Sequence, residues 1–201
     1  MNYHFMQFEG RNYIDGVWKA TADMYPKINP STGKAQGAFP SSGPSDVGAA
    51  VLSARKAFRS WRKVSRFARS DYMNKVAQLI ERDKEKLATV ISLETGKNYN
   101  ESIAEVNEAL HMAQFAFGSG RYSHGEAVSS EIADKDSYML RKPKGVIAII
   151  TPFNFPLAIG MFWNAAPALV EGNTIVIKPS EDAPMSTQMA VKIYEEAGIP
   201  R

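Results

Sequence analysis

Two charged side chains near the C-terminal end of the sequence, Lys178 and Glu181, have the spacing of a ligand-binding pair. Both follow residues 174–177, an apolar run with the composition of a buried strand. An ammonium and a carboxylate at the end of such a strand can both reach the hydroxyl groups of a ribose, so the pair indicates a dinucleotide site. The structural alternative is that Lys178 covers the end of the sheet and Glu181 caps the next helix, where its charge suits the helix dipole.

A third polar side chain, Asn154, follows another apolar run, residues 146–150. It stands between two phenylalanines and shortly before Pro156, so a stiff and bulky loop holds its amide at the strand end. The amide is therefore a candidate functional group. The alternative is an Asx-turn, in which the side chain bonds to the nearby backbone.

The elements that position these residues follow from the pattern of apolar side chains. Residues 146–150 and 174–177 are β-branched runs typical of buried parallel strands. Between them, residues 156–170 have the character of an apolar helix, and residues 184–197 form an amphipathic helix that Gly198 ends. Strand, helix, strand and helix with short links predict a parallel α/β sheet with right-handed crossovers. Ligands of such sheets bind at the carboxyl ends of the strands.

The N-terminal part has a different pattern. Asp15-Gly16 between short strand-forming runs predicts a hairpin, because a type I′ turn needs positive φ at both central residues. A second turn is expected at residues 29–33. Ser45 or Asp46 then caps a helix with a regular apolar stripe. The opposite face of this helix and the residues after it are basic, which we interpret as a solvated surface, with nucleic-acid binding as the alternative: Arg55, Lys56, Arg59, Arg62, Lys63, Arg66 and Arg69.

The middle of the chain is predicted to be helical. Apolar periodicity runs through residues 72–80, breaks over a charged stretch, and resumes at residues 87–91 before Gly96, which indicates two helices or one kinked helix. Another helix is expected over residues 100–117. The glycines that follow it, in residues 118–120, are not a dinucleotide loop, because they come after a helix rather than a strand.

Composition excludes several classes of function. The 201 residues are 44% hydrophobic and 22% charged with a net charge of +3, which describes a globular chain of one to one and a half domains and gives no support for a nucleic-acid or membrane partner. There is no cysteine, so these residues supply no disulfide, no thiolate metal ligand and no thiol nucleophile. The three histidines lack metal-ligand spacing, so no metal is expected. No apolar run could span a bilayer, and we expect a cytoplasmic protein.

Several blocks of the sequence resemble, in the same order, the N-terminal part of NAD(P)-dependent aldehyde dehydrogenases. The last third contributes Thr151-Pro152-Phe153-Asn154-Phe155-Pro156, Ala166-Pro167-Ala168-Leu169, Glu171-Gly172-Asn173-Thr174 and Lys178-Pro179-Ser180-Glu181. The rest of the chain contributes Ile14-Asp15-Gly16-Val17-Trp18, the turn from Asn29 to Gly33, Leu93-Glu94-Thr95-Gly96-Lys97 and Arg141-Lys142-Pro143-Lys144-Gly145-Val146. The one local departure is the stretch 156–163, which is about one residue longer than the family pattern and leaves the substrate side around Phe162 and Trp163 unassigned.

The resemblance implies a fold and a division of the chain. The expected fold is α/β: a Rossmann-like parallel sheet with flanking helices, incomplete, with an N-terminal β-hairpin region and a small bridging β segment. Residues 1–124 would form the N-terminal hairpins and helices of the cofactor-binding domain, residues 125–145 the bridging segment, and residues 146–201 the first half of the Rossmann-like domain. The catalytic domain is expected to be absent from these 201 residues.

The resemblance also implies roles for individual residues. Asn154 resembles the donor that stabilises the tetrahedral oxyanion. Lys178 and Glu181 resemble the pair that holds the adenosine ribose, and the full set expected to bind the cofactor is Ile150, Thr151, Pro152, Phe153, Lys178, Ser180 and Glu181. NAD is favoured, with NADP as the alternative, because the Glu181 carboxylate would repel a 2′-phosphate.

The implied activity is the NAD-dependent oxidation of a small aldehyde to a carboxylate by the full-length protein. Family members use a cysteine thiolate and a water-activating glutamate, and the chain stops at Arg201 before either is expected, so we expect a truncated chain that is inactive alone. The alternative is a non-catalytic nucleotide-binding or interaction module. Residues 136–146 resemble a strand of a subunit interface, which implies a homodimer or homotetramer, with an unpartnered surface hairpin as the alternative.

Overall fold

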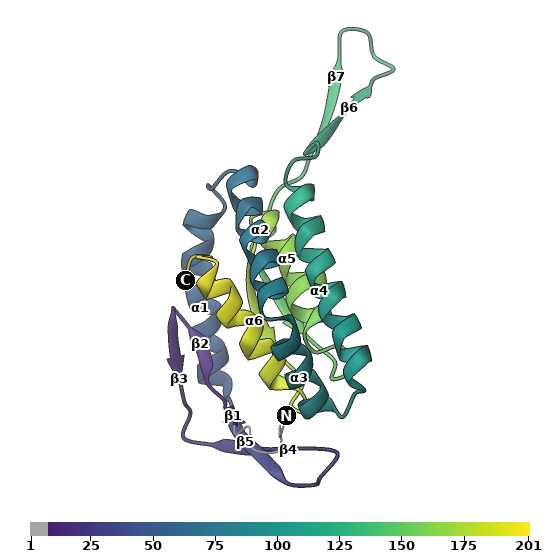
Figure 1. The fold of residues 1–201 in the computed structure, drawn as a ribbon. Coiled ribbons are helices and arrows are strands. Elements are labelled where there is room, and N and C mark those ends of the chain that lie inside the picture. The colour runs from purple at the N-terminus through teal and green to yellow at the C-terminus, as the bar shows by residue number, and fades with distance from the viewer. Residues whose placement is uncertain (1–7) are drawn as a thin grey trace.

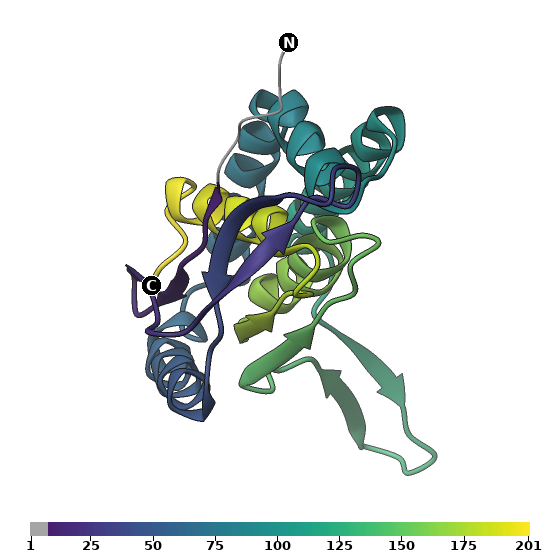
Figure 2. The ribbon, with the colours of Figure 1, turned by 90° about the horizontal axis from the view of Figure 1, so that it is seen from below.

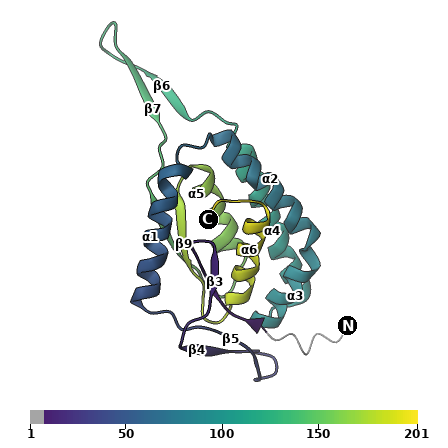
Figure 3. The same ribbon diagram turned by 90° about the vertical axis from the view of Figure 1, so that its left-hand side faces the viewer.

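The structure is a computed structural model that describes residues 8–201. Its centre is a two-stranded parallel sheet of β8 (Val146–Ile150) and β9 (Thr174–Lys178). Helix α1 (Pro44–Trp61) covers one face of this sheet, and a helical layer that includes α5 (Ala166–Val170) covers the other, as Figure 3 shows. The predicted α/β arrangement of parallel strands with flanking helices is confirmed.

Four longer helices complete the helical layers: α2 (Arg66–Arg82), α3 (Lys84–Thr95), α4 (Tyr99–Ser119) and α6 (Pro184–Glu196). The charged stretch after residue 80 separates α2 from α3, so the two-helix interpretation holds. Gly96 ends α3 with a φ of 75°, a left-handed conformation that glycine adopts without strain. The core between these helices and the sheet contains large, fully buried side chains, among them Met73, Ile80, Leu87, Ile91 and Phe162.

Strands β8 and β9 pair from Val146 opposite Thr174 to Ile150 opposite Lys178. One further hydrogen bond, from the amide of Thr151 to the carbonyl oxygen of Lys178 at 3.2 Å, extends the pairing into the loop after β8. The two strand ends that the sequence singled out therefore lie side by side.

The predicted helix of residues 156–170 is a different structure. A π-helix, η2 (Ala158–Ala165), comes first and α5 follows it directly. The π-helix has i→i+5 hydrogen bonds and therefore wider turns than the α-helix that the apolar pattern predicts. Gly160 lets the helix approach β8 closely, because a Cβ there would lie 2.4 Å from the Cγ2 of Thr151. The buried Tyr194 hydroxyl donates a hydrogen bond to the carbonyl of Met161 within the π-helix.

The N-terminal hairpin has the predicted turn. Strands β2 (Asn12–Ile14) and β3 (Val17–Lys19) pair antiparallel, and Asp15 and Gly16 have φ values of 52° and 75°. Both signs match the type I′ turn expected of Asp-Gly. The turn of this hairpin therefore follows from the local sequence.

A three-stranded sheet lies at the lower end of the molecule in Figure 1 and is seen from below in Figure 2. Strand β5 (Ala35–Pro40) lies between β1 (Phe8–Glu9) and β4 (Met24–Ile28). The predicted turn between β4 and β5 is present, since the amide of Gly33 donates to the carbonyl of Asn29 at 2.8 Å. The sheet packs on α3 and the start of α6 through a small separate core of Phe8, Phe39 and Val90, with Met185 and Met189 against it.

Helix α1 begins differently from the prediction. Its N-cap is Gly43, so neither Ser45 nor Asp46 caps it. Asp46 lies in the first turn, where its carboxylate accepts a hydrogen bond from the Gly43 amide at 2.9 Å. Pro44 takes the first helical position, where the missing N–H removes no intrahelical hydrogen bond. Asp46 does lie at the start of the helix, as predicted. It is not the N-cap residue, and its carboxylate instead bonds to the backbone of the N-cap Gly43.

The basic residues 55–69 do not all form a solvated surface, and that part of the prediction is wrong. Arg69 is buried, and its Nε donates to the carbonyl of Val170 at 2.8 Å. Arg66 pairs with the carboxylate of Glu171. Arg69 thus satisfies a carbonyl at the end of α5, where helical carbonyls have no partner within the helix, and Arg66 binds the side chain of the residue that follows α5.

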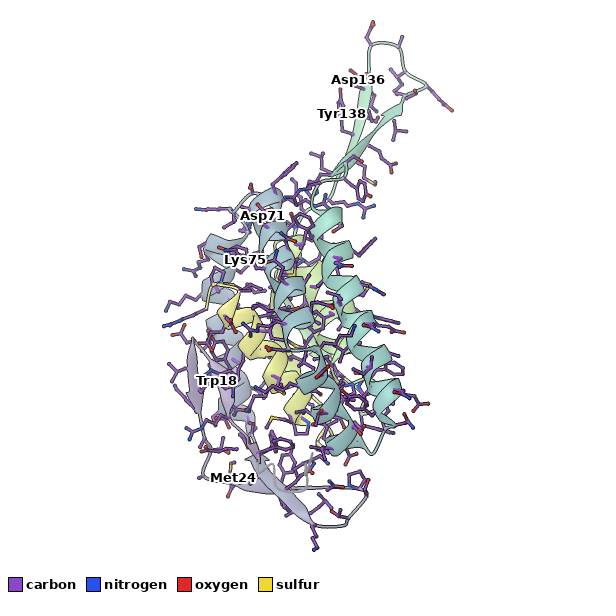
Figure 4. All side chains as sticks on the ribbon, in the orientation of Figure 1. Trp18, Met24, Asp71, Lys75, Asp136 and Tyr138 are labelled. Atoms are coloured by element: carbon purple, nitrogen blue, oxygen red, sulfur yellow. The ribbon has the colours of Figure 1, made fainter. Side chains whose placement is uncertain are left out.

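Strands β6 (Gly125–Ser129) and β7 (Asp136–Leu140) form a hairpin that projects from the helical body (Figure 1). The predicted strand after residue 136 is confirmed. Figure 4 shows Asp136 and Tyr138 on this hairpin, with their side chains away from the core. Five large apolar side chains of the hairpin are exposed: Val128, Ile132, Tyr138, Met139 and Leu140.

A buried carboxylate fixes the start of α6. Glu94 on α3 is only 1% exposed, and its two oxygens accept hydrogen bonds from the amides of Met185 at 2.8 Å and Ser186 at 2.9 Å. These amides belong to the first turn of α6, which has no capping side chain of its own. Burial raises the pKa of Glu94 from 4.5 to about 7, although the two amides and the charge of Lys27 favour the ionised form.

We expect the free energy of unfolding to fall as the pH rises from about 4.5 to about 7. The unfolded chain loses the Glu94 proton near the lower value and the folded chain near the higher one, so this contribution to stability is complete below the lower pKa and is lost above the higher. At about 1.4 kcal/mol per pKa unit, the change is about 3 kcal/mol. Urea unfolding across this pH range measures it.

The Glu94→Gln variant removes the titration and keeps an acceptor for the amides, so its stability should lack this component. Glu85→Gln, which changes an exposed residue of the same helix, is the matched control and should retain it. Equal pH dependence in the Glu94→Gln variant and the unaltered protein would contradict the assignment.

Candidate active site

The carboxyl ends of β8 and β9 bring together most of the predicted site residues. Ile150 ends β8 opposite Lys178 at the end of β9. Ile150 is 80% exposed. Lys178 and Glu181 form an ion pair, with 2.8 Å between Nζ and Oε2, and both side chains are exposed. An exposed apolar strand end therefore lies beside a preformed charged pair.

The electrostatics of the pair keep Glu181 ionised at neutral pH. The hydrogen bond from Lys178 lowers the pKa of Glu181 below its ordinary value. The Glu181 carboxylate is therefore available to a ligand in its charged form. The pair combines an acceptor and a donor, which is the combination that two neighbouring hydroxyl groups can use.

Glu181 does not cap the next helix. Helix α6 starts at Pro184, and the acceptor for its first amides is the distant Glu94. The structural alternative for Glu181 is therefore wrong, because another carboxylate occupies that role.

Ser180 shapes the turn that presents Glu181. Its hydroxyl accepts a hydrogen bond from the amide of Asp182 at 3.2 Å, and its carbonyl accepts one from the amide of Ala183 at 3.2 Å. Ser180 is buried, so its place in the structure is that of a turn former beside the charged pair.

The loop after β8 contains the other predicted residues. Thr151 is buried, and its Oγ1 has no hydrogen-bond partner within residues 8–201. Pro152, Phe153 and Asn154 are all exposed. The loop that follows the end of β8 thus exposes two apolar residues and one amide-bearing residue.

Asn154 does not form an Asx-turn. Such a turn needs the amide hydrogen of the residue two positions on, and that residue is Pro156, which has none. Within the described residues, Lys97 Nζ donates a hydrogen bond to the backbone carbonyl of Asn154 at 2.6 Å. Its side-chain amide is left to face solvent.

Two residues that build this loop were missed in the sequence. Lys97 pairs with Glu105 at 2.6 Å, and Glu105 also accepts hydrogen bonds from the amides of Leu157 and Ala158 at 2.9 and 3.2 Å. A weak signal existed, since Glu105 lies on the buried face of α4, where an apolar residue is expected. Lys97 was part of a recognised block but had no assigned role.

Two further properties bear on the chemistry. No group of three His, Cys, Asp or Glu residues within 8–201 is arranged to hold a metal ion. In the same residues, no helix is both long and apolar enough to cross a membrane.

Comparison with known proteins gives consistent matches. The family model described as "Aldehyde dehydrogenase family" matches residues 18–201. The chain is 39% identical over 193 residues to a betaine aldehyde dehydrogenase of Bacillus subtilis, covering 94% of this chain and 39% of the relative. It is 36% identical over 192 residues to a malonate-semialdehyde dehydrogenase of Lacticaseibacillus casei, with 94% and 39% coverage. The chain thus spans about two fifths of the length of these curated relatives.

Solved structures agree with these matches. A betaine aldehyde dehydrogenase from Staphylococcus aureus in complex with NAD+ superposes with a TM-score of 0.89 at 33% identity, covering 95% of this chain and 39% of that one. An E. coli NADP-dependent enzyme gives a TM-score of 0.91 at 29% identity, covering 96% and 40%. The family match extends over far more than half of the sequence. The chain belongs to the aldehyde dehydrogenase family.

Proposed function

We propose that the protein to which these residues belong oxidises a small aldehyde to a carboxylate, with NAD or NADP as the electron acceptor. The observation that carries this proposal is the meeting of the Lys178–Glu181 pair, exposed Ile150 and the Asn154 loop at the carboxyl ends of β8 and β9. Relatives with 36 to 39% identity are named as aldehyde dehydrogenases, which supports the reaction class.

The residues at the strand ends fit a dinucleotide. Ile150, Pro152 and Phe153 offer exposed apolar surface for the faces of its rings. Lys178 and Glu181 offer a donor and an acceptor to ribose hydroxyls. When bound, the nicotinamide would accept a hydride from the substrate.

Asn154 would stabilise the negative oxygen that develops when a nucleophile attacks the aldehyde carbon. Its exposed side-chain N–H can donate to that oxygen, and such a donor acts most strongly when the surrounding structure fixes it in advance. The 201 residues contain no cysteine, so in this proposal the thiolate nucleophile and the water-activating glutamate belong to other residues of the protein. These residues alone would bind cofactor without turning over aldehyde.

We also propose that the segments of the chain have the separate roles that the family resemblance implies. Residues 1–124 and 146–201 would build the cofactor-binding domain, and residues 125–145 would bridge subunits of a dimer or tetramer. The projecting β6–β7 hairpin supports this role for the middle segment, because its exposed apolar side chains contact no core of their own.

The first test is activity. We expect the protein expressed from its complete reading frame to reduce NAD when supplied with semialdehydes and aliphatic aldehydes, measured by NADH absorbance. Titration of the 201-residue chain with NAD should show binding and no turnover. Nucleotide binding without NADH formation by the complete protein would contradict the proposal and favour a non-catalytic nucleotide-binding module.

The second test is cofactor choice. The Glu181→Gln variant should shift the ratio of kcat/KM values toward NADP by about fivefold, because removing an exposed charge near a 2′-phosphate relieves about 1 kcal/mol of repulsion. The exposed Asp182 of the same turn gives the matched control, Asp182→Asn, which should leave the ratio unchanged. Equal effects of the two variants would show that Glu181 does not contact the ribose.

The third test is association. We expect light scattering to give a dimer or tetramer for the complete protein. The Tyr138→Glu/Leu140→Glu variant places two charges on one face of β7, since alternate strand residues point the same way, and should reduce the mass while the thermal unfolding midpoint changes little. A monomeric unaltered protein would overturn the interface assignment.

A further inference from the structure

We propose that Lys97 and Glu105 are positioning residues that hold the Asn154 loop in its reactive geometry. This inference rests on the proposed function, in which Asn154 donates to the developing oxyanion. Neither residue reaches the exposed strand ends itself. They act through the backbone on which Asn154 and its neighbours are carried.

The ammonium group of Lys97 is held on three sides. Nζ donates to the carbonyl oxygen of Asn154 at 2.6 Å and to Oε2 of Glu105 at 2.6 Å. The same nitrogen lies 4.1 Å from the centroid of the Phe155 ring, which is the distance of a cation–π contact. Only 15% of the Lys97 side chain is exposed. A lysine ammonium has three hydrogens, so these contacts define its orientation.

The carboxylate of Glu105 extends the connection to the other end of the loop. It is fully buried, and its second oxygen accepts the amides of Leu157 and Ala158. On the strand side, the amide of Thr151 is bonded to Lys178. The loop is therefore fixed where it leaves β8, in the middle at Asn154, and where η2 begins.

This arrangement fixes the backbone from which the Asn154 side chain extends. Within residues 8–201 that side chain makes no hydrogen bond, so the backbone contact from Lys97 is what places the amide within reach of the strand ends. A displacement of about 1 Å in a positioned catalytic group can lower a rate about 10²-fold. Loss of the Lys97 contact would release the carbonyl of the same residue that supplies the oxyanion donor.

A double-mutant cycle on the complete protein tests the inference. We expect Asn154→Ala to lower kcat about 10² to 10³-fold, as for other oxyanion donors, and Lys97→Met to lower it at least tenfold with the dissociation constant for NAD unchanged. If Lys97 acts through Asn154, the double variant should be no slower than Asn154→Ala alone. Lys97→Arg keeps the charge and should recover part of the loss. Lys63→Met, a change of an exposed lysine, is the control.

Amide hydrogen exchange gives a readout that does not depend on turnover. We expect the amides of Leu157 and Ala158 to exchange at least tenfold faster in Lys97→Met, with the rates in α2 unchanged. Additive losses in the cycle, or unchanged exchange at these amides, would overturn the inference. An inactive unaltered protein would instead overturn the proposed function and the catalytic part of this inference, while exchange would still decide whether Lys97 orders the loop.

Discussion

The amides at the buried beginnings of helices need acceptors, and this requirement governs the arrangement of the strand ends. The helix after β8 begins at Leu157 and Ala158, whose amides bind Glu105, and the helix after β9 begins at residues whose amides bind Glu94. Both carboxylates come from earlier helices, α4 and α3. Because an unpaired buried amide is costly, each strand-to-helix connection is tied to a helix far away in the sequence.

This solution places two carboxylates in the interior, and each has a cation nearby. Lys97 pairs directly with Glu105, and the positive charge of Lys27 acts on Glu94. Burying one partner without the other typically costs about 3 to 5 kcal/mol, so the cations belong to the same structural unit as the acids. The exposed Lys178–Glu181 pair is different in kind, since neither charge there is needed to satisfy the backbone.

The pattern of residue types along the sequence predicted those parts of the fold that depend on the conformational preferences of neighbouring residues. The β-branched runs of β8 and β9, Asp-Gly at residues 15–16 and Gly96 after α3 all carry their own conformational preference. The meeting of the two strand ends, where the candidate residues lie, follows from the parallel pairing of these strands. The roles of Arg69, Glu94 and Glu105 could not be predicted the same way. Each bonds to backbone groups between 52 and 101 residues away, and periodicity carries no information about such partners.

The π-helix of η2 also sets the orientation of the helix that follows it. In an α-helix each residue turns the chain by about 100° about the helix axis, and the wider turns of a π-helix change this angle. The direction in which Leu169 and Val170 face therefore depends on the wide turns before α5, and both residues are buried in the core. A return of residues 158–165 to α-helical geometry would rotate α5 about its axis and turn these two side chains relative to the core.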